Sequence, residues 1–185
     1  MKKYISGFTI VELLIVVIVI GILTTIGAVA YRGVSDRARN SQTISAAEQW
    51  YKGLEMYKAR NGSYPNAAGC LGSNYGYNEG NVATGTYQCR QDTASSGIVS
   101  NSTLNTALAK HVTGSPSPAM VTASNSATLW KRGVSYFNSN PARLDVTLDG
   151  PLTTCPALGK LAGAATTYTN GNVVCIYTLG PLNTY

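Results

Sequence analysis

A single carboxylate stands inside the most apolar stretch of the chain. Residues 8–30 read FTIVELLIVVIVIGILTTIGAVA, and Glu12 is their only charged member. A helix of this length and composition can cross a hydrocarbon layer of about 30 Å. A carboxylate in such a segment is costly unless it has a partner, so Glu12 is a candidate functional residue.

Gly7 and Phe8 form a candidate processing site. Residues 1–7, MKKYISG, are short and polar, and the small residue Gly7 stands before the apolar stretch. A secretory signal has its small-residue cleavage site after the apolar region, so cleavage removes that region. Cleavage after Gly7 would instead leave the apolar segment on the mature protein.

The N-terminal residues resemble a known family. The run G-FTIVELL, behind a short basic leader and ahead of an unbroken Ile/Val/Leu segment, resembles the type IV pilin class of prepilins. That class includes pilus subunits, competence pilins and the pseudopilins of type II secretion. The resemblance covers about residues 1–65. It implies that a prepilin peptidase cuts between Gly7 and Phe8 and methylates the new Phe8 amine. It also implies that Glu12 pairs with the N-terminal amine of a neighbouring subunit.

The direction of insertion is the point on which the signals disagree. Arg32, Arg37 and Arg39 follow the apolar segment, and such charges favour the cytoplasmic side. The cleavage motif and the cysteines favour the opposite direction. We expect a single-pass protein of the inner (cytoplasmic) membrane with its head outside, which later enters an extracellular or cell-envelope filament. A plain uncleaved signal anchor is the alternative, and it leaves the Gly-Phe-Thr-x-x-Glu spacing unexplained.

Four cysteines lie beyond the apolar segment. They form no C-x-x-C pair, and His111 is the only histidine, so we expect no metal site and no cofactor. An even number of cysteines behind a membrane segment favours disulfides in an oxidising compartment. Three connectivities are open; we favour Cys70–Cys89 with Cys155–Cys175, since the two loops are then similar in length. Each bridge would stabilise the fold by about 3 kcal/mol.

The apolar segment continues into one long helix over about residues 8–60, since no proline or turn signal interrupts it. Its first half, residues 8–30, would be membrane or filament-core material, and its second half, residues 31–60, is amphipathic. The apolar positions of that second half are Val34, Ala38, Ile44, Ala47, Tyr51, Leu54 and Tyr57. Asn61-Gly62 is a helix C-terminal signal.

Residues 61–185 form the predicted globular head. Residues 66–101 are rich in glycine and asparagine and read as a loose region held by Cys70 and Cys89. A short helix is expected over residues 102–112, capped by Asn101 or Ser102. Alternating patterns predict strands over residues 129–137, 144–148, 164–169 and 173–179. The expected fold is α+β: a long N-terminal transmembrane and amphipathic helix packed against an antiparallel head sheet of three or four strands, as in pilins.

The head offers little that points to catalysis, and we expect no enzyme. Asp145 and Asp149 read as turn and surface residues rather than as an acid/base pair, and His111 as a partner of a helix dipole. Several basic residues and one tryptophan could form a weak DNA-binding surface, with ordinary solvated charges as the simpler interpretation. These residues are Lys110, Trp130, Lys131, Arg132, Arg143 and Lys160.

The function expected from these residues is structural: a subunit of a type IV pilus or a pilus-like filament. The alternatives are a minor or competence pilin that binds DNA or a surface ligand, and a type II secretion pseudopilin. The expected partners are other pilin subunits, prepilin peptidase, the pilus assembly platform and, before assembly, the membrane. Adhesion, twitching motility, DNA uptake and secretion all stay open as the purpose of the filament.

Overall fold

The computed structural model describes residues 9–73, 75, 87–93, 96–126 and 129–181. The chain divides into two compact units, one that ends at Asp36 and one that begins at Arg37. Helix α1, Ile10–Asn61, contributes to both units. It ends where the sequence predicts, since the Gly62 amide donates to the Lys58 carbonyl at 2.8 Å and closes the last turn.

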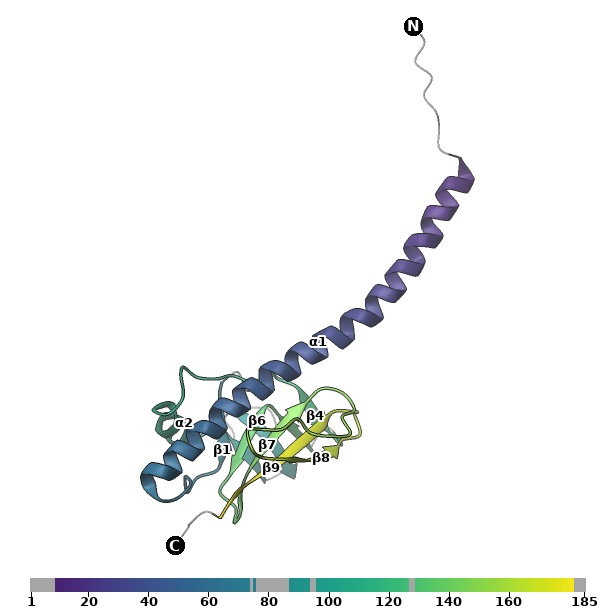
Figure 1. Ribbon diagram of the computed structural model, residues 1–185. Coiled ribbons are helices and arrows are strands. Elements are labelled where there is room, and N and C mark those ends of the chain that lie inside the picture. Colours follow the sequence, from purple (N-terminus) through teal and green to yellow (C-terminus); the bar gives the residue numbers. More distant parts are fainter. Residues whose placement is uncertain (1–8, 74, 76–86, 94–95, 127–128, 182–185) are drawn as a thin grey trace. The chain divides into compact units, whose positions relative to one another are not determined.

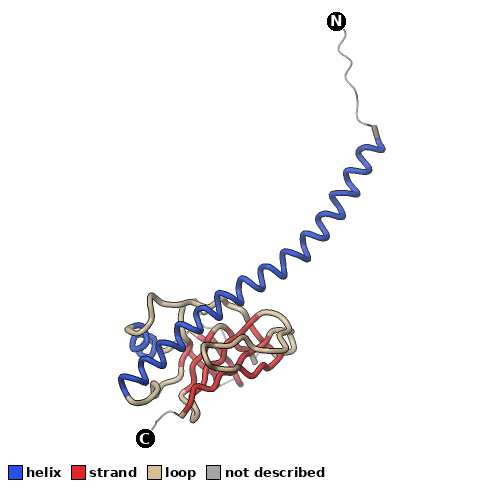
Figure 2. The backbone as a smooth tube through the Cα atoms, viewed as in Figure 1, coloured by secondary structure: helices blue, strands red, loops and turns tan. Residues whose placement is uncertain are grey.

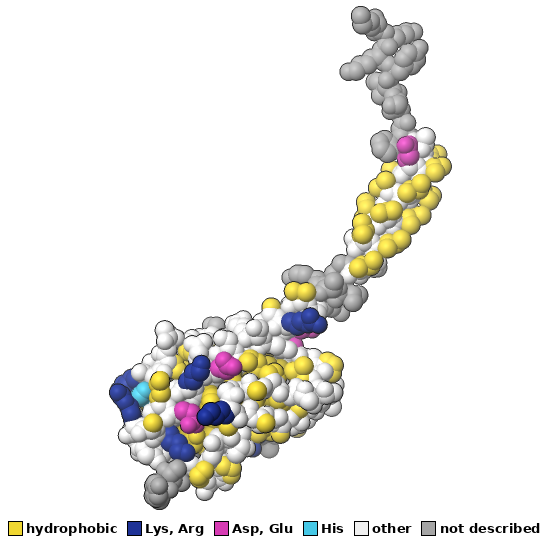
Figure 3. All heavy atoms as spheres, viewed as in Figure 1, with side chains coloured by type: hydrophobic (Ala, Val, Ile, Leu, Met, Phe, Trp, Pro, Cys, Tyr) yellow, Lys and Arg dark blue, Asp and Glu magenta, His cyan; other side chains and the backbone are white. Residues whose placement is uncertain are grey.

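The first unit exposes a nearly continuous apolar surface. Figure 3 shows the hydrophobic side chains that cover the visible side of this part of α1. Between Ile10 and Ile26, the large apolar side chains are 47% to 85% exposed. Among the described residues, no helix has both the length and the apolar character needed to cross a membrane. The spanning segment expected over residues 8–30 is therefore not confirmed and stays a prediction.

The second unit contains two antiparallel sheets, seen around the labelled strands in Figure 1. The five-stranded sheet has the order β1-β6-β7-β9-β8, with β1 Gly69–Cys70, β6 Val134–Phe137, β7 Ala142–Leu148, β9 Val173–Gly180 and β8 Gly163–Thr167. The four-stranded sheet has the order β3-β2-β5-β4, with β3 Ser96–Val99, β2 Gln88–Thr93, β5 Trp130–Arg132 and β4 Thr122–Ser124.

The C-terminal half of α1 packs on the five-stranded sheet, and Figure 2 shows this helix running across the strands. Ala47, Trp50 and Leu54 share one buried cluster with Leu144 of β7 and Tyr177 of β9. The indole of Trp50 also donates to the Pro116 carbonyl at 2.8 Å. The predicted α+β architecture is confirmed.

The buried stripe of α1 differs in part from the predicted one. Ala47 and Leu54 are fully buried, as expected, while Tyr51 and Tyr57 are only partly buried. Trp50, which the predicted stripe omits, lies at the centre of the helix–sheet contact and is 1% exposed. Val34 belongs to the first unit and is 66% exposed there.

One strand prediction is wrong for a local reason. Residues 129–137 do not form one strand, because Gly133 adopts φ +60 and separates β5 from β6. A residue with positive φ cannot continue a regular strand, so β5 and β6 enter different sheets. The region 66–101, read as loose, contains β1, β2 and β3. The head therefore has nine strands in two sheets among the described residues, where three or four in one sheet were expected.

Helix α2, Ser102–Ala109, begins as predicted and ends earlier than the expected residue 112. Asn101 is its N-cap, since its Oδ1 accepts from the Leu104 amide at 3.0 Å. Leu104 and Leu108 point into the core. The opposite side of this helix is left to solvent.

Candidate functional site

The start of α1 contains a reciprocal hydrogen-bonded pair. The Thr9 amide and hydroxyl both donate to Glu12 Oε2, at 2.9 and 2.8 Å. The Glu12 amide in turn donates to Thr9 Oγ1 at 3.3 Å. Thr9 is the N-cap and Glu12 the third helical residue, which is the geometry of a capping box. Gly7 and Phe8, the predicted processing residues, lie outside the described residues.

This capping box changes the reading of Glu12. The sequence predicts a partner for Glu12 only in an assembled filament, whereas the single chain already gives its carboxylate two donors from Thr9. Thr9 was not among the predicted site residues, although it is the hydrogen-bond partner of Glu12. The Thr-x-x-Glu spacing at the start of an apolar helix was the signal that could have found it.

The apolar surface beyond Glu12 also satisfies its own polar groups. Thr24 donates its hydroxyl to the Ile20 carbonyl at 2.9 Å, and Thr25 donates to the Gly21 carbonyl at 3.1 Å. A hydroxyl that bonds to its own helix leaves no polar group in need of water. The hydroxyls of Thr24 and Thr25 are therefore satisfied within the helix itself.

The matched family model decides the class of this N terminus. Residues 2–28 match the model of the prokaryotic N-terminal methylation motif. The chain has a prepilin-type N terminus. The matched stretch contains Gly7, Phe8 and Glu12, the residues on which the predicted processing and assembly depend, and the resemblance seen in the sequence is confirmed there. No curated protein and no solved structure matches the chain.

The head of this chain contains two disulfides. Cys70 of β1 is bonded to Cys89 of β2, and Cys155 is bonded to Cys175 of β9. These are the two sequence-local pairs that the sequence analysis favours. The first bridge joins one sheet to the other, and the second ties the segment before β8 to β9 of the five-stranded sheet. Among the described residues, no group of three or more metal-ligating side chains occurs.

Asp145 is a buried ion-pair centre, which corrects its prediction as a surface residue. Its Oδ2 contacts Arg90 Nη1 at 2.9 Å and Lys131 Nζ at 3.1 Å. Arg143 Nε lies 3.3 Å from Oδ1, an ion-pair distance without hydrogen-bond geometry. Asp145 is 1% exposed, and Arg90 and Arg143 both lie over the Phe137 ring. The arrangement fastens β2 and β5 of one sheet to β7 of the other.

The predicted DNA-binding surface is broken up by this arrangement. Lys131 and Arg143 are held by Asp145, and Lys131 is 9% exposed. Arg132 donates to Thr122 Oγ1 at 2.8 Å and lies over the Trp130 ring. Lys110 follows α2 and lines a different part of the surface. Lys131, Arg132 and Arg143 are therefore engaged within the head itself.

Asp149 and His111 each contact residues of α1. Asp149 pairs with Arg39 of α1 at 2.6 Å, and its amide donates to Asn40 Oδ1 at 2.7 Å. Both contacts attach the end of β7 to α1. His111 lies two residues beyond the end of α2, with its ring edge-on to Tyr57 at a centroid distance of 6.3 Å. Asp145 and Asp149 engage separate cations and do not face each other as an acid/base pair.

Proposed function

We propose that this chain is a structural subunit of a type IV pilus or a related pilus-like filament. The prepilin-type motif over residues 2–28 is the observation that carries the proposal. Processing would occur between Gly7 and Phe8, with methylation of the new Phe8 amine. Prepilin peptidase and the pilus assembly platform are then its processing and assembly partners.

The exposed surface of α1 supports polymerisation through this helix. The large apolar side chains from Ile10 to Ile26 are about half exposed or more in the single chain. Full burial of one such side chain stabilises by about 1.5 to 3 kcal/mol. Packing against the same segment of other subunits would bury many at once, which provides the driving force for a filament.

Before polymerisation, the same apolar segment would anchor the subunit in the inner membrane with the head outside. The two disulfides support an oxidising location for the head. On leaving the membrane, Glu12 would approach the Phe8 amine of a neighbouring subunit. Two opposite charges in apolar surroundings are far less costly as a pair than apart, so the contact favours one register of assembly.

The mature N terminus of the native protein tests this proposal. Mass spectrometry should find chains that begin at Phe8 with one added methyl group. In Gly7→Val, a β-branched side chain stands at the scissile bond, and we expect full-length precursor and no filament. A normal amount of mature N terminus in that variant would contradict the assigned site.

The abundance of the chain in sheared filaments distinguishes the finer assignments. A major pilin would dominate their protein content, and a minor or competence pilin would be a small fraction. A pseudopilin would be needed for protein secretion, with little filament on cells at native expression. Each result keeps the prepilin class and selects one role within it.

A further inference from the structure

The strand β8 forms an exposed edge of the five-stranded sheet. It is the last strand in the order of that sheet, and among the described strands it pairs only with β9. Its residues from Ala164 to Thr167 are all exposed, whereas Val173, Val174 and Cys175 of the neighbouring β9 are buried. An edge strand presents a row of unpaired amides and carbonyls, which is a template for a further strand.

The register identifies the backbone groups of β8 that point away from β9. The Tyr168 amide donates to the Asn172 carbonyl at 2.9 Å, so these two residues form a hydrogen-bonded pair beside the turn. Hydrogen-bonded pairs recur at every second position of an antiparallel ladder, so Thr166 and Ala164 also bond to β9. The residues between them direct their amides and carbonyls outward. These outward residues are Gly163, Ala165 and Thr167.

The fold protects the edge of β4, which ends the other sheet, in a way that it does not protect β8. Asn170 and Asn172 each donate a side-chain amide to the Thr122 carbonyl, at 2.8 and 2.9 Å. Asn170 also accepts from the Ser124 amide at 3.2 Å, and the Thr169 hydroxyl donates to the Ser124 carbonyl at 2.9 Å. Side chains of the turn after β8 therefore satisfy the backbone of β4, whereas β8 itself stays exposed.

The sequence of β8 also lacks the features that keep edge strands from pairing. Such strands usually carry lysine, proline or a bulge. β8 reads GAATT, and it pairs with β9 without a register shift. No charged residue occurs over residues 161–181. Its side chains are small, so a second strand can approach the edge closely.

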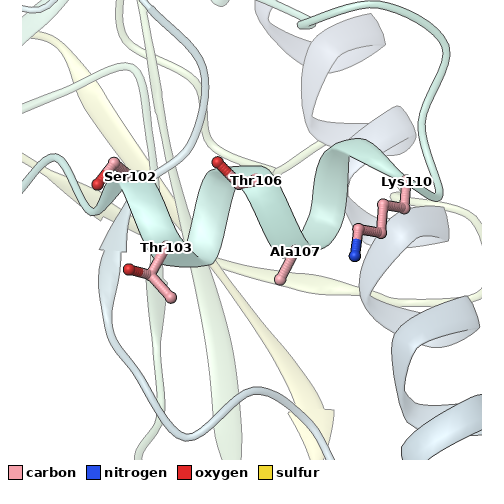
Figure 4. Close-up of a pocket in the computed structure, with 5 residues that line it drawn as sticks. All are labelled: Ser102, Thr103, Thr106, Ala107 and Lys110. Atoms are coloured by element: carbon pink, nitrogen blue, oxygen red, sulfur yellow. The ribbon is translucent and has the colours of Figure 1, made fainter.

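The hollow beside α2 is a weaker candidate for an interaction surface. It has a volume of about 400 Å³, and Figure 4 shows its lining residues, Ser102, Thr103, Thr106, Ala107 and Lys110. The amides and carbonyls within a helix bond to one another, so this surface offers mainly side chains. β8 offers backbone groups, which give an added strand its affinity.

We propose that β8 of one copy of this chain pairs antiparallel with β8 of a second copy, about a two-fold axis at Ala165. In this register Ala165 lies opposite its own counterpart and Gly163 lies opposite Thr167, so all outward residues meet. A centre at Ala164 or Thr166 would pair only two of the three. No charges meet, because β8 has none. The edge is therefore complementary to itself, as a contact between identical surfaces requires.

The two-fold symmetry separates this contact from the proposed one along α1. A two-fold axis reverses the direction of one copy, so the contact cannot repeat between successive subunits of one filament whose subunits all point the same way. In filaments it joins two that lie side by side in opposite directions, a consequence that rests on the proposed function. The five residues of β8 bury little surface, so one pair binds weakly and repetition along two filaments provides avidity.

Disulfide trapping with the full-length chain in a non-ionic detergent, under mild oxidation, tests the register. Ala164 of one copy lies opposite Thr166 of the other, with Cα atoms about 4.5 Å apart, which a disulfide can bridge. Two copies of the same residue lie about 8 Å apart, which is too far. Both positions are on the opposite face of the sheet from Cys175, since side chains alternate along a strand.

An equal mixture of Ala164→Cys and Thr166→Cys should give about five times more covalent dimer on a non-reducing gel than either variant alone. Ala165→Lys, added to both partners, should reduce the yield to that of the single variants, because it places two ammonium groups opposite each other. Ala165→Thr is the matched neutral control, favourable in a strand, and should keep the yield.

Four results would overturn the proposal. No dimer in the mixture would exclude the contact, and equal dimer in the mixture and the single variants would indicate random collision. Most dimer from Thr166→Cys alone would exclude the centre at Ala165. An unchanged yield with Ala165→Lys would exclude direct opposition at that residue. None of these results bears on the mature N terminus, so failure of this proposal is distinguishable from failure of the filament role.

Discussion

At the scale of single residues, Glu12 has two roles to separate: a local hydrogen bond to Thr9 and a charge for assembly. The variants Glu12→Gln and Glu12→Val separate these roles. Both should still be cut after Gly7, because Glu12 lies beyond the proposed scissile bond. Glu12→Gln keeps an amide that can complete the capping box but removes the charge, and Glu12→Val removes both. If the charge directs assembly, both variants should lower the yield of sheared filaments about ten-fold or more, since losing a buried pair costs several kcal/mol.

The mature N terminus, measured by mass spectrometry, is the processing control for these variants. Normal filament yield in Glu12→Gln with loss in Glu12→Val would show that the helix cap matters and the charge does not. Unchanged yield in both would remove Glu12 from the assembly mechanism.

Asp145 and Asp149 provide a matched pair for the free energy of unfolding. Asp145→Asn leaves Arg90, Lys131 and Arg143 around a neutral side chain, and the loss of a buried partner typically costs about 3 to 5 kcal/mol. Asp149→Asn breaks one pair whose Arg39 side chain is 49% exposed, so we expect about 1 kcal/mol or less. Urea unfolding followed by tryptophan fluorescence measures both. Equal losses would contradict the assignment of Asp145 as the ion-pair centre.

At the scale of elements, Gly133 decides how β5 and β6 are placed. Its carbonyl accepts from the Thr147 amide at 2.8 Å, and a Cβ there would lie 2.8 Å from Tyr75 Oη. Tyr75 is buried, and its hydroxyl accepts from the Val134 amide at 3.1 Å. Burial raises the pKa of Tyr75 well above its ordinary value, so this hydroxyl stays neutral in the fold.

Replacement of Gly133 by alanine therefore adds a steric clash to a backbone cost. We expect Gly133→Ala to lower the free energy of unfolding by about 3 kcal/mol. Gly114→Ala is the control: it has a similar positive φ of 75, with no atom within 4 Å of the added Cβ. Its cost should be about 1 to 2 kcal/mol from the backbone alone. Thermal or urea unfolding of both variants would show no difference if the contact with Tyr75 were unimportant.

At the scale of the whole molecule, two long-range connections hold the head together. The Cys70–Cys89 bridge joins β1 to β2, and Asp145 joins β7 to β2 and β5, so each connects one sheet to the other. The Cys155–Cys175 bridge ties an irregular segment to β9.

The two disulfides should contribute similar free energies of unfolding. Their cysteines are 19 and 20 residues apart, so the entropy of the unfolded chain is restricted almost equally. Replacing either pair by alanines should cost about 3 kcal/mol in urea unfolding under non-reducing conditions. A loss below about 1 kcal/mol for either pair would contradict the loop-closure account for that bridge.

Local signals in the sequence determined the parts of this protein that depend on short separations. The leader, the apolar stretch and Glu12 are contiguous, and the family match covers the same residues. The end of α1 at Asn61 also rests on neighbours in the chain. For the N-cap of α2 the sequence left Asn101 or Ser102 open, and for the cysteines it favoured the local pairs among three connectivities; the structure has Asn101 and the local pairs. Propensity, capping and loop closure act over short separations, which is why one sequence carried these predictions so far.

Only the tertiary structure decided what comes together from distant segments. Arg90 and Asp145 are 55 residues apart, and no local pattern states that they meet or that Asp145 is buried. Residues 129–137 have one continuous alternating pattern, yet the backbone at Gly133 sends its two halves into different sheets. Gly53 of α1 and Val112 likewise meet only in the fold, since a Cβ at Gly53 would lie 2.8 Å from Val112 Cγ1. Strand pairing and close packing are set by contacts across the whole fold, which the order of residues along the chain does not display.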